Sequence, residues 1–143
     1  MTIRVLCLCT GNSARSIIAE ALLRHRNDGA FEVHSAGTYP KGINPFTVKV
    51  LEQGGLSTKG LYSKPVTEFE HQTFDYVITV CDQAAEQCPV FPGDPDRIHW
   101  SFTDPAAVEG TDVEKLAAFQ ATLREMRQRI DLFTVVARPK QRV

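Results

Sequence analysis

The sequence predicts a single α/β domain, a three-layer fold with a central, parallel, four-stranded sheet and helices on both faces. Apolar segments of strand length alternate with amphipathic segments of helix length, and the connections between them are short. The 143 residues, 43% hydrophobic and 23% charged, suit one globular domain. We expect this domain to span residues 1–137 and the tail at residues 138–143 to be loosely held.

Four segments have the composition of strands. Ile3–Cys9 is an apolar run broken only by Arg4, and it ends at a turn-forming Thr-Gly-Asn sequence, as a buried central strand would. The other predicted strands cover residues 31–36, 74–81 and 97–102.

Three segments are typical of helices. Ser13 is in position to cap the first, over residues 14–26, and the second begins at Asn44-Pro45 and continues to residue 53. A Thr-x-x-Glu capping box at residues 111–114 begins the third. Its apolar residues recur every three or four positions, as in a helix packed on a sheet: Leu116, Phe119, Leu123, Met126, Ile130 and Phe133.

Charge and hydropathy argue against several classes of partner. The formal net charge of −1 gives no reason to expect nucleic acid or an anionic membrane surface. No apolar run reaches the roughly 18 residues of a membrane span, and the apolar stretch before Thr10 is too short for a secretory signal. We therefore expect a cytoplasmic protein whose thiols are kept reduced.

Reduced thiols give weight to a chemical role for the four cysteines, at positions 7, 9, 81 and 88. They form no Cys-x-x-Cys pair, and the histidines at positions 25, 34, 71 and 99 do not cluster near them in the sequence. We therefore predict no metal site. Cys7 lies within the first strand, where a core role is expected.

The segment that points to a function joins the first strand to the first helix and has the pattern Cys-x5-Arg. Backbone N–H groups at the start of a helix lack partners within it, and the helix dipole adds positive potential there. Gly11 permits a sharp turn that aims several N–H groups at one centre, and the planar guanidinium of Arg15 fits two oxygens of a tetrahedral anion. We predict an oxyanion site formed by Thr10, Gly11, Asn12, Ser13, Ala14, Arg15 and Ser16.

Cys9 begins this loop and is the predicted nucleophile. An electropositive setting favours a thiolate, and the Ser16 hydroxyl is placed to donate a further hydrogen bond to the sulfur, so no histidine base is needed. The alternative, an inert cysteine in a tight turn, stays open, because the Cys-x5-Arg spacing alone also occurs by chance.

These motifs resemble those of the low-molecular-weight tyrosine phosphatase superfamily and, within it, the thioredoxin-coupled arsenate reductases. The resemblance covers most of the chain, including residues 9–16, 35–38, 44–45, 63–64, 75–82, 88–89, 99–100 and 104–105. It implies that the Cys-x5-Arg loop binds the oxyanion and that Asp104 donates a proton to the leaving oxygen. His99 and Trp100 are expected to pack beneath the loop that carries this acid.

The resemblance also implies that three thiols reduce arsenate in succession. Cys9 attacks bound arsenate, and Cys81 attacks the cysteine–arsenic adduct and releases arsenite. Cys88 then resolves the first disulfide to a Cys81–Cys88 bridge, which thioredoxin reduces. Phosphate and sulfate are expected to compete for the site. The position of Cys81 at the carboxyl end of a predicted strand suits this role, because ligand crevices of parallel sheets lie at those ends.

The spacing of Cys81 and Cys88 limits how they can form a bridge. The six residues between them favour a helix, but a seven-residue helical separation is about 10 Å, whereas a disulfide needs Cα atoms within about 7 Å. We expect residues 81–88 to form either a loop or a helix that unwinds on oxidation.

Some reductases of this superfamily hold a potassium ion near the loop, and Asn12, Glu20 and Ser35 match three positions of that site. Lys64 stands where an acidic ligand is expected, so its ammonium group can replace the ion. We predict no required metal and no other cofactor.

Two other functions stay open on the sequence. A phosphatase acting on phosphotyrosine or small phosphate esters would need no reductant and would tolerate loss of Cys81 or Cys88, although residues 106–108 lack the aromatic residue usual after the Asp-Pro pair. A thiol redox sensor or anion-binding module would keep its Cys81–Cys88 redox response after substitution of Arg15.

Overall fold

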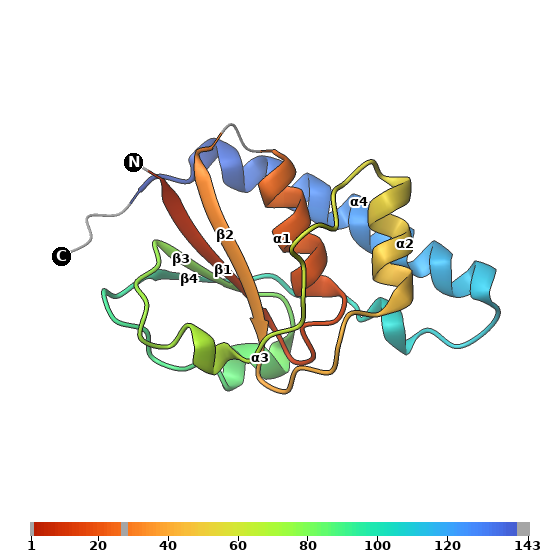
Figure 1. Ribbon diagram of the computed structural model, residues 1–143, viewed down its shortest axis with the longest axis horizontal. Coiled ribbons are helices and arrows are strands. Elements are labelled where there is room, and N and C mark those ends of the chain that lie inside the picture. Colours follow the sequence, from red (N-terminus) through yellow and green to blue (C-terminus); the bar gives the residue numbers. More distant parts are fainter. Residues whose placement is uncertain (1, 27–28, 140–143) are drawn as a thin grey trace.

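The computed structural model describes residues 2–26 and 29–139 and confirms the predicted α/β fold (Figure 1). Within these residues the sheet has four parallel strands in the order β2–β1–β3–β4. Leu8 pairs with Ala36 on one side and with Thr79 on the other, so the central strands end at a common edge. The strands are β1 (Ile3–Cys9), β2 (Phe31–Gly37), β3 (Tyr76–Thr79) and β4 (Asp96–His99).

The long helices cover one face of the sheet. Helices α1 (Arg15–His25) and α4 (Asp112–Val136) lie on this face, and α2 (Pro45–Gln53) packs beside them (Figure 1). The Phe133 ring of α4 contacts the rings of Phe31 and Tyr76, with centroids 6.1 and 5.1 Å apart. The predicted apolar stripe of α4 is buried at Phe119, Leu123, Met126, Ile130 and Phe133, and Leu116 is half-buried.

Shorter elements cover the opposite face. Successive side chains of a strand point to opposite faces, so His34 lies on the side away from α1 and α4. Its ring contacts Phe69, which in turn contacts Phe74, and Phe74 contacts Phe91. The 3-10 turn η1 (Val66–Glu68) and helix α3 (Asp82–Glu86) belong to this layer.

The third and fourth strands are shorter than predicted. β3 stops at Thr79 because the chain turns into α3, for which Cys81 is the N-cap residue. β4 stops at His99, yet Trp100 beyond it is still buried, in edge-to-face contact with Phe102 and Phe133. Apolar composition indicates which residues are buried, not which are paired in the sheet. After both β3 and β4 the chain stays buried beyond the last paired residue, so the predicted strands were too long.

Two predicted helix starts are confirmed. The Asn44 side-chain oxygen accepts a hydrogen bond from the Phe46 N–H at 2.8 Å, with Pro45 in the first turn of α2. Thr111 and Glu114 make the two reciprocal bonds of a capping box at the start of α4. These caps fix where α2 and α4 begin.

At its C-terminal end the described chain stays in contact with the sheet. Ala137 is buried, and the Arg138 N–H donates to the Tyr76 hydroxyl at 3.0 Å. The rest of the predicted loose tail, residues 140–143, lies outside the described residues. Over residues 2–26 and 29–139, none of the helices has both the length and the apolar character needed to traverse a bilayer.

Candidate active site

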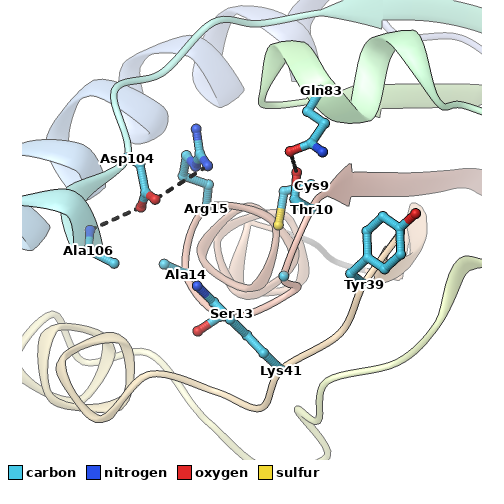
Figure 2. Close-up of a pocket in the computed structure, with 11 residues that line it drawn as sticks. Cys9, Thr10, Ser13, Ala14, Arg15, Tyr39, Lys41, Gln83, Asp104 and Ala106 are labelled. Carbon is cyan, nitrogen blue, oxygen red and sulfur yellow. Dashed lines mark hydrogen bonds and ion pairs between the residues drawn. The ribbon is translucent and has the colours of Figure 1, made fainter.

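The Cys-x5-Arg segment forms a loop between the carboxyl end of β1 and the first turn of α1. A cavity of about 350 Å³ opens at this loop. Figure 2 shows the Cys9 sulfur in the middle of the side chains that line it. The lining residues are Cys9, Thr10, Gly11, Ser13, Ala14, Arg15, Tyr39, Lys41, Gln83, Asp104 and Ala106. Two of the predicted oxyanion residues, Asn12 and Ser16, are fully buried behind the loop and do not line the cavity.

Ser13 does not cap α1, and that prediction is wrong. The N-cap residue is Ala14, and within the described residues no side chain makes a capping bond there. The Ser13 carbonyl instead accepts hydrogen bonds from the Asn44 N–H and the Thr47 hydroxyl, which attach the loop to the start of α2. Without a side-chain cap, the N–H groups of the first turn are free to bind an anion.

Cys9 is 3% exposed and has hydrogen-bonding groups directed at its sulfur. The Ser16 hydroxyl lies 2.8 Å from the sulfur, the contact expected from the sequence, and the Asn12 backbone N–H donates to it at 3.2 Å. Asn12 reaches this position with a left-handed φ of 44°. These two groups hold the sulfur in place and are positioned to donate hydrogen bonds to it.

The Asn12 side chain links the loop to two other segments. Its oxygen accepts from the Lys64 backbone N–H at 2.8 Å, and its nitrogen donates to the hydroxyls of Ser16 and Ser35 at 2.8 and 3.0 Å. Ser35 donates in turn to a carboxylate oxygen of Glu20 at 2.6 Å. A hydrogen-bonded chain therefore connects a buried carboxylate to the group beside the Cys9 sulfur.

The buried Glu20 carboxylate is balanced by two cations. The Lys64 ammonium lies 3.8 Å from one of its oxygens, with only 3% of the Lys64 side chain exposed, and Arg24 pairs with the other oxygen. Burial lowers the pKa of Lys64, and the nearby Glu20 charge opposes that shift. The structure thus brings together the residues expected around a potassium ion and places a lysine among them.

Arg15 and Asp104 lie together at one side of the cavity (Figure 2). The Arg15 guanidinium donates to the Phe102 carbonyl at 3.0 Å, and a second nitrogen is 3.8 Å from the Asp104 carboxylate. Asp104 also accepts a hydrogen bond from the Ala106 N–H, at the start of η2 (Pro105–Ala107). The predicted anion ligand and the predicted proton donor are therefore adjacent.

Cys81 lies at the same edge of the sheet as the loop. The Val80 N–H donates to the Leu8 carbonyl at 2.9 Å, which continues the pairing of β1 and β3 up to this edge. Cys81 is 6% exposed, and its sulfur is 3.3 Å from the Thr10 hydroxyl oxygen. The second predicted thiol therefore contacts the residue that follows Cys9.

Cys81 and Cys88 flank helix α3 in their free-thiol form, so the loop alternative for residues 81–88 is wrong for this state. Burial raises the pKa of the half-buried Cys88 thiol, and the Arg97 charge opposes this rise. Cys7 is completely buried, and burial raises its pKa far above the usual value, with further increases from Glu20 and Cys9. Cys7 has the surroundings expected of a core residue.

Four cavity residues were not predicted from the sequence: Tyr39, Lys41, Gln83 and Ala106. Lys41 donates its backbone N–H to the Gly11 carbonyl at 3.0 Å, and its side chain lies so close over Gly11 that a Cβ there would be 2.8 Å from the Lys41 Cε. Gln83 accepts a hydrogen bond from Thr10 at 3.3 Å. Lys41 could have been predicted as a cavity residue, because it is a basic residue that follows the carboxyl end of a parallel strand, where ligands bind.

Sequence comparison matches this chain to one protein family and to arsenate reductases. Residues 4–138 match the family model described as low molecular weight phosphotyrosine protein phosphatase. An arsenate reductase of Halalkalibacterium halodurans is 40% identical over 126 residues, which cover 88% of this chain and 91% of that protein. The arsenate reductase of Bacillus subtilis is 37% identical with the same coverage.

Solved structures share the fold. The thioredoxin-dependent arsenate reductase of Corynebacterium glutamicum superposes with a TM-score of 0.65 at 32% identity, over 92% of this chain and 63% of that one. A low molecular weight protein tyrosine phosphatase from T. tengcongensis superposes with a TM-score of 0.78 at 20% identity, over 95% of this chain and all of that one. The chain belongs to the low molecular weight phosphotyrosine protein phosphatase family, in company with bacterial arsenate reductases.

Proposed function

We propose that this protein is an arsenate reductase in which Cys9, Cys81 and Cys88 act in turn and thioredoxin restores the thiols. The observation that carries this proposal is the position of Cys81, whose sulfur is 3.3 Å from the Thr10 hydroxyl at the rim of the anion loop. Hydrolysis of a phosphate ester needs no second thiol there, whereas reduction does. The arsenate reductase names of relatives at 37–40% identity support the same choice.

The first step forms a bond between Cys9 and arsenic. Arsenate is held by the N–H groups of the loop and by Arg15, and the Cys9 thiolate attacks the arsenic atom. One arsenate oxygen leaves as water after receiving a proton, for which Asp104 is the donor. The Asp104 carboxylate lies 3.8 Å from the Arg15 guanidinium, so the proposed proton donor is next to the group that would hold the arsenate oxygens.

The second step transfers the electrons. The Cys81 thiolate attacks the Cys9 sulfur and forms a disulfide, while the sulfur–arsenic bond breaks and its electron pair stays on arsenic. Arsenic(V) becomes arsenic(III), and arsenite leaves. The Thr10 hydroxyl is placed to stabilise the attacking Cys81 thiolate by a hydrogen bond.

The third step frees Cys9 for another cycle. The Cys88 thiolate attacks the Cys81 sulfur and displaces Cys9 as a thiolate, which leaves a Cys81–Cys88 disulfide. Helix α3 has to unwind for this step, because it separates Cys81 from Cys88, and seven residues at the helical rise span about 10 Å, more than the roughly 7 Å that a disulfide allows. Two thiols of thioredoxin then reduce the bridge by exchange, a coupling for which the thioredoxin-dependent relative from Corynebacterium glutamicum is the precedent.

We further propose that no potassium ion is needed beside the loop. Potassium prefers a group of oxygen ligands, and Asn12, Glu20 and Ser35 offer three. The positive charge that would balance Glu20 is already supplied by Lys64 and Arg24, and the Asn12 side-chain oxygen already accepts a hydrogen bond from the Lys64 backbone N–H. The residues present therefore do not suit a bound cation, and the mechanism uses none.

A single-turnover experiment tests the proposed function. Fully reduced protein is mixed with arsenate in the absence of any other reductant, and free thiols and released arsenite are counted. We expect two thiols lost per arsenite and a Cys81–Cys88 bridge in the peptide map. The Cys88→Ser variant should still release one arsenite per chain but should not turn over with thioredoxin, and Cys81→Ser should release none.

The alternative is a low-molecular-weight protein tyrosine phosphatase, which the family match alone also suits. It predicts multiple turnovers of an aryl phosphate without reductant, unchanged by Cys81→Ser or Cys88→Ser, and no thiol loss with arsenate. Weak phosphatase activity would not contradict reduction, because phosphate and arsenate have nearly the same shape and charge. Thiol loss with arsenate decides between the two.

A further inference from the structure

A group of hydrogen bonds ties the start of helix α3 to the ends of strands β3 and β4. One Asp82 carboxylate oxygen is 2.8 Å from the His99 Nε2 atom and accepts from the Ser101 hydroxyl at 3.0 Å. The other ring nitrogen of His99, Nδ1, is 2.8 Å from the Thr79 hydroxyl. We refer to Thr79, Asp82, His99 and Ser101 as the α3 clasp.

The bonds of the clasp are mutually consistent. An ionised carboxylate only accepts hydrogen bonds, so the proton of a neutral His99 ring lies on Nε2, and Nδ1 accepts from the Thr79 hydroxyl. Thr79 and His99 are register partners in adjacent strands, which fixes one side of the clasp to the sheet. The bonds from His99 and Ser101 lower the pKa of Asp82, so it stays ionised at neutral pH.

Helix α3 depends on such restraints. It has five residues, far fewer than the roughly 12 at which an isolated helix begins to be stable in water. Ala84 is buried against the sheet, and Asp82, the first residue of the helix, is held by the clasp. Loss of the clasp therefore favours the unwound segment, which is the form that a Cys81–Cys88 bridge requires.

We propose that Asp82, His99 and Ser101 are positioning residues that hold α3 helical and thereby limit the rate at which Cys88 reaches Cys81. This inference rests on the proposed thiol relay. While the clasp is closed, Cys81 stays beside Thr10, where it can attack an adduct on Cys9. Premature closure of the Cys81–Cys88 bridge would remove that thiol before arsenate is reduced.

The test measures bridge formation without arsenate, in a Cys9→Ser background so that only Cys81 and Cys88 form the bridge. The oxidant is diamide, which takes up two electrons and two protons from the two thiols and becomes a hydrazine. The variants are Asp82→Asn, His99→Gln and Ser101→Ala. The control is Asp112→Asn, which removes a carboxylate from the equivalent first position of helix α4.

We expect each clasp variant to form the Cys81–Cys88 bridge about three- to tenfold faster than its parent, the range expected for one or two partly exposed hydrogen bonds. Amide hydrogen exchange should rise in residues 82–87 and stay unchanged in α4. The control should match the parent in both measurements.

Two results would overturn the inference. One is an unchanged bridging rate in all three variants. The other is acceleration in Asp82→Asn alone, since the helix N-terminal charge and not the clasp would then be responsible. Bridging that is faster in all three variants supports the clasp even if the parent protein releases no arsenite, a separate result that would refute the reductase function.

Discussion

The Thr10 hydroxyl oxygen lies 3.3 Å from the Cys81 sulfur and 3.3 Å from the Gln83 side-chain oxygen. A hydroxyl has one proton, so Thr10 donates to Gln83 while Cys81 is a thiol and can turn to the sulfur when Cys81 becomes a thiolate. Because Thr10 directly follows Cys9, these contacts connect the Cys-x5-Arg loop to Cys81 and to helix α3.

Thr10→Val should slow arsenite release while leaving arsenate binding intact. The change keeps the shape of the side chain but removes a hydrogen bond to a developing thiolate, a loss expected to slow the step about 10- to 100-fold. Rapid-quench measurement of arsenite in a single turnover gives the rate, and Thr10→Ser should restore most of it. Equal rates in Thr10→Val and the parent would show that Cys81 needs no such bond.

Lys41→Gln should weaken oxyanion binding more than it slows the chemistry. Lys41 lines the cavity on the side away from Arg15 and supplies a second positive charge near the loop (Figure 2). We expect KM for arsenate to rise about three- to tenfold, with a smaller change in kcat and a weaker dependence on ionic strength. Lys49→Gln, an exposed change on α2, is the control. A fall in kcat with KM unchanged would contradict a role in binding alone.

Lys64→Ala should destabilise the protein and make its stability sensitive to potassium. Removing one partner of a buried ion pair costs about 3 kcal/mol, although Arg24 still balances part of the Glu20 charge. Thermal unfolding in KCl and in NaCl, at equal ionic strength, should recover part of the loss in KCl only. The parent and the exposed-site variant Lys49→Ala should each unfold at the same temperature in KCl and in NaCl. A parent protein that is more stable in KCl than in NaCl would contradict the idea that Lys64 replaces the ion.

Alkylation of Cys88 should have its pH midpoint above that of an unfolded thiol. Burial disfavours the thiolate and raises the pKa of Cys88, so the reactive fraction stays small at neutral pH and rises about tenfold per pH unit below the midpoint. The rate with iodoacetamide is measured against pH in a Cys9→Ser/Cys81→Ser variant. Because Arg97 lowers the Cys88 pKa, Arg97→Gln should move the midpoint further upward, and a downward movement would refute this assignment.

Cys7 should not react in the folded protein. It is fully buried and its pKa is raised mainly by burial, so the thiolate population is negligible. A thiol reagent should therefore titrate at most three groups in native protein and four in denaturant. Peptide mapping identifies the protected residue, and early labelling of Cys7 would show that strand β1 opens far more readily than its burial indicates.

The parts of the fold that follow from local patterns could be predicted from the sequence. The apolar run of β1, the capping box at Thr111 and the heptad-like stripe of α4 each report a local periodicity or a local hydrogen bond. The loop that follows β1 was also predictable, because Cys9 and Arg15 lie on one short connection whose geometry is set by the strand and helix on either side.

Features that depend on separate segments meeting in space could not be predicted in this way. The α3 clasp joins residues 79, 82, 99 and 101, and the contact of Lys41 with Gly11 joins two loops. Ser13 was mispredicted for a different reason: its carbonyl accepts hydrogen bonds from Asn44 and Thr47, contacts from a distant segment that hold it outside the N-cap position.

The direction of β1 has a practical consequence. Ile3 begins the strand and Cys9 ends it, so the described N-terminal end lies about 20 Å from Cys9. The Arg138 N–H donates a hydrogen bond to the hydroxyl of Tyr76, the first residue of β3. The end of α4 therefore also lies at the edge of the sheet where the strands begin, away from the cavity. A linker attached before Ile3 or after Arg138 would therefore start at the edge of the sheet remote from the cavity, which leaves the cavity accessible when the protein is fixed to a surface.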